Sequence, residues 1–146
     1  MNTQDIDRAV RRLGRDIAER AKGSGASRDL AIVGIRRGGV HLGLRLRKEL
    51  ASALGAEPPF GTLDIALYRD DLADKGAAPV IGPTDIRFPV QGKTVVLVDR
   101  GGRELPIAAD FTGAKVEVPD DQDVQVRLRE SGAAEDAVVV KPRRGP

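Results

Sequence analysis

Hydrophobic residues near the beginning of the chain recur every three or four positions. This spacing puts apolar side chains on one face of a helix, so it predicts an amphipathic helix from Asp5 to Lys22. Thr3 or Asp5 can cap its start, and Gly23-Ser24-Gly25 ends it. The polar side of this helix is either an ordinary solvated face or a binding surface; its arginines are Arg8, Arg11, Arg12, Arg15 and, one turn beyond, Arg20.

A buried strand and a basic turn follow the helix. The apolar run Asp29–Ile35 is typical of a strand covered on both faces of a parallel sheet. It leads directly into Arg36-Arg37-Gly38-Gly39, and a leucine-rich helix is predicted from about Val40 to Ala53. A strand, a glycine-containing turn and a helix start can direct backbone N–H groups at an anion. Two adjacent glycines also make ordinary tight turns, so this motif alone identifies no ligand.

A second buried strand, Thr94–Asp99, ends in a carboxylate. Open α/β folds bind their ligands at the carboxyl edge of the sheet, which makes Asp99 a candidate site residue. The stretch from Ala73 to Gln91 has no clear period over roughly 20 residues, which is typical of a lid, an arm or disorder. The remaining pattern predicts strands at Phe60–Tyr68, Val124–Leu128 and Ala137–Val140, a strand end with a turn at Asp110–Gly113, and a frayed tail at Lys141–Pro146.

Length and composition narrow the class of protein. The 146 residues are enough for one domain, and 40% hydrophobic with 32% charged residues indicates a globular chain. The absence of cysteine excludes disulfides, thiol catalysis and cysteine-ligated metal, and a single histidine argues against a histidine-based metal cluster. No apolar run approaches the roughly 20 residues that span a bilayer, and the polar start lacks the layout of a secretory signal. We therefore expect a cytoplasmic protein without a membrane partner.

The balance of charge points toward phosphate. The net charge is only +2, but most of the positive charge is arginine, whose planar fork binds phosphate in two places at once. Nucleotides and nucleic acid are both plausible partners on this basis. Aromatic residues make up only 3% of the chain, which leaves little material for a base-stacking platform.

Several stretches together resemble the PyrR family, whose members are pyrimidine-operon attenuation regulators and also uracil phosphoribosyltransferases. These stretches follow the order of the family and touch nearly the whole chain. The most specific is Val98–Ile107, which reads Val-Asp-Arg-Gly-Gly-Arg-Glu-Leu-Pro-Ile; the others are Ile6–Lys22, Ile32–Gly39, Leu63–Leu72, Lys93–Asp99 and Ala109–Phe111.

The resemblance implies a type I phosphoribosyltransferase-like α/β fold, in which a parallel sheet is flanked by helices and completed by a mobile arm and a small C-terminal hood. On this basis residues 1–146 form one domain, with a core at 5–68 and 93–99, the arm at 69–92, and the hood and C-terminal strands at 100–140. The implied reaction transfers the phosphoribosyl group of phosphoribosyl pyrophosphate (PRPP) to uracil, giving UMP and diphosphate, with Mg²⁺ bridging the leaving group. The implied partners are uracil or UMP, PRPP, the leader RNA of pyrimidine genes, whose binding uridine nucleotides promote, and further copies of the chain in a homo-oligomer.

The resemblance also implies roles for individual residues, none of them a metal ligand. The family's pyrophosphate loop matches Arg36, Arg37, Gly38 and Gly39, although the family usually has a threonine and then an arginine at positions 37 and 38. The root of the mobile arm matches Arg69, Asp70 and Asp71. Arg100 matches the hood arginine that lies against the nucleotide, and Val124 matches a hood residue near the base. The RNA-binding surface matches Arg11, Arg12, Arg15 and Arg20 in the first helix and Arg103 in the hood.

One part of the family pattern is missing. In the family a strand ending in Val-Asp leads to a second acidic residue, a Thr-Gly-Arg-Thr type loop, a helix and a second strand ending in Val-Asp, and only then to the hood. Here Val98-Asp99 passes directly into the hood sequence at Arg100, so a crossover unit on the order of 30 residues is absent. If Asp99 belongs to the first family strand, it is half of the ribose-binding acidic pair; if it belongs to the second, it is structural. Its continuation into the hood favours the second.

The missing unit leaves three interpretations of function. The lost loop is the one that holds the 5′-phosphate of PRPP in the family, so we expect uracil phosphoribosyl transfer to be impaired. The alternatives are a non-catalytic RNA-binding attenuation regulator and a truncated paralogue without independent function. Loss of a strand and its covering helix also exposes apolar surface, at roughly 25 cal/mol per Å², so the sheet must close without them, lean on a partner subunit or be unstable.

Overall fold

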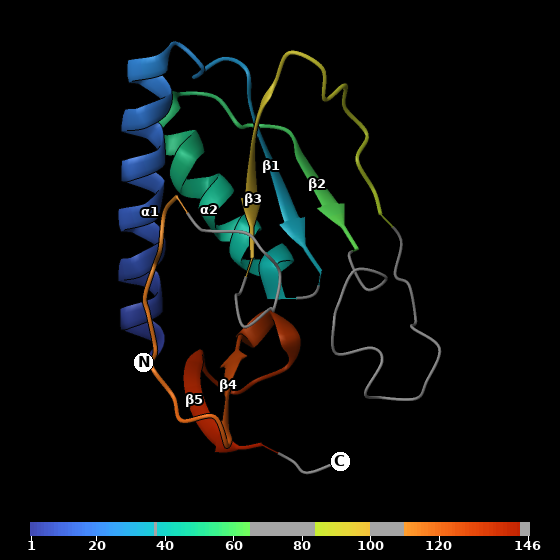
Figure 1. The fold of residues 1–146 in the computed structure, drawn as a ribbon. Helices are drawn as coiled ribbons and strands as arrows, with labels where there is room; N and C mark the ends of the chain where they lie inside the picture. The colour runs from blue at the N-terminus through green and yellow to red at the C-terminus, as the bar shows by residue number, and fades with distance from the viewer. Residues whose placement is uncertain (37, 65–83, 100–109, 144–146) are drawn as a thin grey trace.

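The computed structural model describes residues 1–36, 38–64, 84–99 and 110–143, and these form an α/β structure (Figure 1). Its first half alternates strands and helices, and its C-terminal part is a hairpin. Within the described residues the elements are α1 (Thr3–Ser24), β1 (Leu30–Ile35), α2 (Gly38–Leu54), β2 (Phe60–Leu63), β3 (Thr94–Val98), β4 (Gln122–Arg127), the 3-10 turn η2 (Arg129–Ser131) and β5 (Ala137–Pro142). None of the described helices is long and apolar enough to cross a membrane.

The central sheet is parallel, with strand order β2-β1-β3. Ile32 of β1 lies opposite Phe60 on one side and opposite Val96 on the other. The chain therefore leaves β1 through α2 to reach β2, and later returns to the opposite side of β1 to form β3. In open α/β sheets, such a reversal between neighbouring strands marks the place where ligands bind. The expected parallel sheet flanked by helices is confirmed.

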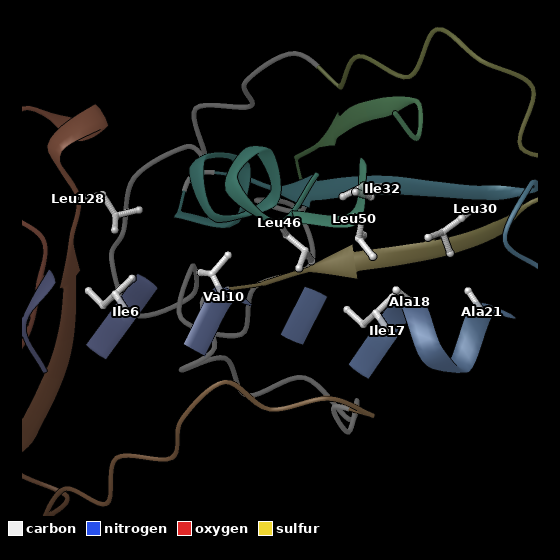
Figure 2. Packing of buried hydrophobic residues seen from close by; sticks show 10 residues of the cluster. All are labelled: Ile6, Val10, Ile17, Ala18, Ala21, Leu30, Ile32, Leu46, Leu50 and Leu128. Carbon is white, nitrogen blue, oxygen red and sulfur yellow. The ribbon is translucent and has the colours of Figure 1, made fainter. Parts of the chain in front are cut away.

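The core forms where α1 and α2 pack on one face of this sheet. Because side chains alternate along a strand, Leu30 and Ile32 of β1 face the helices, and both are almost completely buried. Leu50 of α2 is fully buried against them. The apolar stripe predicted for the first helix supplies much of the rest of the cluster, which comprises Ile6, Val10, Ile17, Ala18, Ala21, Leu30, Ile32, Leu46, Leu50 and Leu128 (Figure 2).

Helix α1 forms as predicted but extends two residues further at each end, from Thr3 to Ser24 and not from Asp5 to Lys22. The capping residue is Asn2, not Thr3 or Asp5. The Asn2 side chain accepts a hydrogen bond from the Asp5 N–H at 3.0 Å, and the Asp5 carboxylate accepts one from the Asn2 N–H at 3.1 Å. This reciprocal pair satisfies two backbone donors at once, which a lone Thr3 or Asp5 cannot do. At the other end, Gly25 adopts a φ of 74°, a left-handed conformation that suits glycine.

Two glycines let the start of α2 fit between β1 and β3. A Cβ atom added to Gly34 in β1 would lie 2.7 Å from the Cα of Val40. A Cβ added to Gly39 would collide with the carbonyl oxygen of Val98 and would lie 3.4 Å from the Cα of Asp99. Both neighbours are backbone atoms, which cannot move aside as a side chain can. The helix start is therefore held against the carboxyl ends of both strands.

The outer part of β3 is covered less well than β1. Leu97 lies opposite Val33 in the register and on the same face, but Leu97 is 57% exposed whereas Val33 is 2% exposed. Among the described strands, β3 pairs only with β1. An apolar side chain left open on an outer strand is what loss of a neighbouring strand and its covering helix would produce.

The C-terminal hairpin of β4 and β5 is tied to the N-terminal helices. Val138 and Met1 exchange backbone hydrogen bonds, and the Thr3 hydroxyl donates to the Asp136 carbonyl. The main link is Arg45 of α2, which donates two hydrogen bonds to Glu130 and two to Asp136 at 2.6–3.0 Å. Asp136 is 2% exposed and also accepts the Arg129 N–H. Hydrogen bonds from Arg45 hold the pKa of both carboxyls below their ordinary values.

Three boundary predictions need revision. Residues 110–113, expected to end a strand, form bends without strand pairing because they lie against α1 and not in a sheet. Lys141 and Pro142, expected to fray, belong to β5 because they pair with Asp123 and Gln122. The predicted strand Phe60–Tyr68 is confirmed only as far as Leu63, and positions 65–68 lie outside the described residues, as do 144–146 of the predicted tail.

We predict that Arg45→Met lowers the free energy of unfolding by about 3 kcal/mol at neutral pH, because it leaves the buried Asp136 carboxylate without its cation. Urea unfolding measures this loss. Glu130→Gln is the control: this carboxyl is part-exposed, and its replacement should change stability by less than about 1 kcal/mol. Equal effects of the two substitutions would contradict the central role of Asp136.

The same cluster predicts a pH dependence. Since the folded-state pKa values of Asp136 and Glu130 are lowered, their contribution to stability is complete above the ordinary carboxyl values of 3.8 and 4.5. It is lost as the pH falls through the lowered folded-state values. The urea midpoint of the unsubstituted protein should therefore fall more steeply on acidification below about pH 4.5 than that of Arg45→Met. Parallel curves would contradict this assignment.

We also predict that Gly39→Ala lowers the free energy of unfolding by about 1–3 kcal/mol, since the new methyl group must displace the Val98 backbone. Gly23→Ala is the matched control within a helix. Nothing lies within 4 Å of a Cβ at Gly23, so alanine should leave stability unchanged or raise it by up to about 1 kcal/mol. Thermal or urea unfolding compares the two variants, and a neutral Gly39→Ala would exclude the close approach described above.

Candidate functional site

The carboxyl ends of β1 and β3 meet at the start of α2. The Arg36 N–H still donates to the Leu63 carbonyl at 2.9 Å, so the chain leaves the sheet only after Arg36. Gly39 in the first turn of α2 then touches the backbone of Val98 and Asp99. The first turn of α2 contains no acidic residue, whereas α1 carries Asp5 in its first turn. No carboxylate within the first turn of α2 therefore neutralises the positive end of the helix, and this favours binding of an anion there.

This arrangement brings together four of the residues predicted to bind substrate. All four lie at the carboxyl edge of the sheet, where the strand order reverses. Arg36 follows β1, Asp99 follows β3, and Gly38 and Gly39 begin α2. Val124 lies in the separate hairpin, where it pairs with Val140. The other predicted substrate-binding residues, Arg37, Arg69, Asp70, Asp71 and Arg100, fall outside the described residues.

The returning segment 84–86 lies on the outer edge of β2, which the sequence did not indicate. The Thr62 and Asp85 backbones exchange two hydrogen bonds of 2.9 Å, and the Asp64 N–H donates to the Thr84 hydroxyl at 3.2 Å. Asp64 therefore also stands at the carboxyl edge of the sheet. Within the described parts of the chain, no three or more histidine, cysteine, aspartate or glutamate side chains gather as a metal site.

Four of the five arginines of α1 divide into two groups, and the fifth, Arg8, lies 4.0 Å from the Asp5 carboxylate. Arg12 donates to the carbonyl oxygens of Thr112 and Gly113, so it holds a segment that lies about 100 positions further along the chain. Arg20 approaches the Asp110 carboxylate at 3.9 Å, and its guanidinium lies 5.4 Å from the centre of the Phe111 ring. This segment, drawn in orange, runs beside α1 (Figure 1). We call residues 110–113 the α1 strap.

The second group of arginines faces solvent. Arg11 and Arg15 are exposed, and neither forms an ion pair with a residue in the described ranges. Arg11 also borders a hollow of about 160 Å³ between the two helices, whose other lining residues are Asp7, Val10, Arg45, Lys48 and Glu49. Arg103, the remaining predicted RNA-binding residue, lies outside the described part of the chain.

Sequence reasoning missed the strap and the Arg45 cluster. The contacts of Arg12 and Arg45 join positions 85–101 residues apart, and no local spacing rule reports such pairs. In the structure Gly113 fits closely against the helix, where a Cβ atom would lie 3.2 Å from Leu13. A glycine in a predicted turn does not reveal such a fit from sequence alone.

Two solved structures share the overall fold of this chain. The chain superposes on a hypoxanthine phosphoribosyltransferase from Trypanosoma cruzi with a TM-score of 0.58 and 18% sequence identity, over 79% of each chain. A glutamic acid mutant from a study of an invariant aspartic acid in such enzymes gives a TM-score of 0.58, 17% identity and the same coverage. At these identities the likeness concerns the fold alone. No model of a known protein family matches the chain.

Curated relatives match along nearly the whole chain. It is 38% identical to the bifunctional protein PyrR of Roseiflexus, over 96% of this chain and 92% of the relative. For the bifunctional PyrR proteins of Chloroflexus aurantiacus and Listeria monocytogenes the identity is 36%, over 96–97% of this chain and 93–94% of the relatives.

The lengths of these alignments show that part of the relatives has no counterpart here. The Roseiflexus alignment covers 172 positions, whereas 96% of 146 residues is about 140, so about 32 positions are unmatched in this chain. This number agrees with the size of the strand-helix-strand unit that the sequence lacks after Asp99. With more than 35% identity across nine-tenths of each relative, the chain belongs to the PyrR family.

Proposed function

We propose that this protein is a regulator of pyrimidine biosynthesis genes that binds their leader RNA through the arginine face of α1, and that it transfers the phosphoribosyl group to uracil poorly or not at all. The observation that carries the proposal is the contrast between the two surfaces. The α1 helix keeps exposed arginines, of which Arg11 and Arg15 form no ion pair with a described residue, whereas the carboxyl edge of the sheet keeps only one turn that we propose to bind an anion. We place its action in the cytoplasm and in a homo-oligomer.

Charge and shape support RNA as the ligand of α1. Arg11 and Arg15 project from neighbouring turns without a counter-ion among the described residues, so phosphates can take that place. Lys48 on α2 borders the same hollow as Arg11, although Asp7 and Glu49 also line it, so the argument rests on Arg11 and Arg15. Arg12, Arg20 and Arg103 extend this surface in our proposal. Two of them, Arg12 and Arg20, already fix the strap beside the helix.

The retained turn supports binding of diphosphate. Arg36, Arg37, Gly38 and Gly39 would bind it through backbone N–H groups and the start of α2. Arg69, Asp70 and Asp71 would close over it from the arm, while Arg100 and Val124 would contact uracil or UMP. PRPP also needs a site for its 5′-phosphate, and no second strand-turn-helix unit follows β3 in the described residues to supply one. Binding of the leaving group alone does not hold the reacting sugar in line.

The position of β3 supports a different assignment of Asp99 from the one expected. In a doubly wound sheet the first strand to cross to the far side of β1 becomes its direct neighbour, and the next strand lies one place further out. Since β3 is the direct neighbour of β1, we propose that it corresponds to the first of the two family strands. Asp99 is then one half of the ribose-binding pair. This differs from the expectation based on its continuation into the hood.

Mg²⁺ would enter this site with its substrate. Mg²⁺ is commonly held by phosphate oxygens and one or two carboxylates, with waters completing its shell. Asp99 and Asp64 are the carboxylates at the carboxyl edge of the described strands, and they form no metal site by themselves. We therefore propose that any Mg²⁺ is bound as a complex with diphosphate or PRPP.

We predict that Arg15→Ala weakens binding to the leader RNA of the pyrimidine genes, because it removes one phosphate contact. The slope of log affinity against log salt should become shallower by about 1. Filter binding or gel shift across a salt series measures both changes. Arg28→Ala, at an exposed arginine outside α1, is the matched control and should leave the slope unaltered. Unchanged affinity of Arg15→Ala would exclude the proposed RNA face.

We predict no formation of UMP above background when the purified protein is incubated with labelled uracil, PRPP and Mg²⁺. The physical reason is the missing site for the 5′-phosphate. As a positive arm, calorimetric titration with magnesium diphosphate should still detect binding, and Gly39→Ala should weaken it because the methyl group disturbs the turn. Turnover at about 1 s⁻¹ or faster, an ordinary enzymatic rate, would overturn this part of the proposal.

A further inference from the structure

Arg20 and Phe111 form a stacked pair on the proposed RNA surface. The guanidinium carbon of Arg20 lies 5.4 Å from the centre of the Phe111 ring, within the distance at which a cation is attracted to an aromatic face. Phe111 is only half-buried and packs against the edge of the hydrophobic core. The ring is therefore anchored from behind, and Arg20 covers its outer side.

Asp110 limits the guanidinium from another direction. One oxygen of its carboxylate lies 3.9 Å from a terminal nitrogen of Arg20. This long ion pair involves one terminal nitrogen of the guanidinium and is not a hydrogen bond, so it leaves the rest of the group open. The side chain of Arg20 is 65% exposed, which agrees with an open outer face.

The place of this pair in the fold connects it with the phosphate-binding arginines. Arg12 holds the same strap through the Thr112 and Gly113 carbonyls, eight residues before Arg20 on α1. Eight residues of helix span about 12 Å. Arg12 and Arg20 both face the strap, whereas Arg11 and Arg15 lie about 180° and about 140° around the helix axis from Arg20. RNA that contacts the strap side of α1 would therefore come within reach of the Arg20 plane.

We propose that Arg20, backed by Phe111 and held at its edge by Asp110, is a stacking platform for one unpaired base of the bound RNA. Proteins recognise loops and bulges by stacking splayed bases on aromatic rings or arginine planes. Arg20 would then contact a base through its planar face as well as through its charge, and Phe111, one of the few aromatic residues of the chain, would support that face. The proposal rests on the RNA-binding function proposed above and specifies that the surface recognises one unpaired base.

The test separates the plane of Arg20 from its charge. Arg20→Lys keeps the charge and removes the planar group, so we expect binding to the leader RNA to weaken by about fivefold or more, the lower end for loss of a stacked base. The salt slope should stay unchanged because no charge is lost. Phe111→Leu should weaken binding similarly by removing the backing of the guanidinium. Arg28→Lys, at an exposed arginine outside α1, is the matched control and should bind within about twofold of the original protein.

Modified RNA identifies the base. In a set of leader RNAs with single loop bases replaced by abasic sugars, one replacement should weaken the original protein by the same factor as Arg20→Lys. The combination of that RNA with Arg20→Lys should show little further loss, because both changes remove one contact. Circular dichroism of each variant checks that the exposed substitutions leave the fold intact.

The outcomes distinguish the two proposals. If Arg20→Lys binds as the original protein does, or if its effect is additive with every abasic replacement, the stacking platform is excluded while RNA binding by α1 stands. If the unsubstituted protein does not bind the leader RNA at all, the proposed function and the platform both fall.

Discussion

The structure depends on the close packing of the start of α2 between β1 and β3. Only glycine fits at position 39, where a Cβ would collide with the Val98 carbonyl, and Gly34 permits the same approach from the β1 side. This packing fixes the direction in which α2 leaves the sheet and so determines how its other end meets α1. It also brings the backbone N–H groups of the first turn of α2 next to Asp99. The same contact thus supports the core and shapes the turn that we propose to bind an anion.

A second, electrostatic constraint connects the two ends of the chain. Arg45 joins α2 to Glu130 and Asp136, and the N-terminal residues pair with β5. As a result the C-terminal hairpin is fixed to the helices, although the described residues contain no strand that joins it to the parallel sheet. Removal of a crossover unit from the middle of the chain therefore leaves both remaining parts attached to one core.

Sequence patterns predicted the elements whose signals are local. The three-and-four spacing of apolar residues defined α1, and the β-branched runs defined β1 and β3. The turn at Gly39 and Asp99 each follow a predicted strand, and the rule that parallel strands end at one edge accounts for the contact between them. The α1 strap could not be predicted in this way, because Arg12 and Leu13 meet residues 100 positions away. The cap was misassigned for a different reason: Asn2 and Asp5 exchange hydrogen bonds over three positions, a local spacing that the prediction of Thr3 or Asp5 did not consider.

The exposed Leu97 on β3 is what loss of a neighbouring strand would produce. Loss of a whole crossover unit has a consequence for how the activities of such proteins separate during evolution. A parallel sheet is assembled from repeating crossover units, so excision of one whole unit keeps the handedness and the inner face of every strand that remains. A deletion that shifts a strand by one residue would reverse its faces and expose its core side chains. In this family the elements proposed to bind RNA lie outside the excised unit, and those proposed to hold the sugar phosphate lie within it. One genetic event can therefore remove enzymatic activity from a regulator while the elements proposed for gene control remain, and selection can then maintain them.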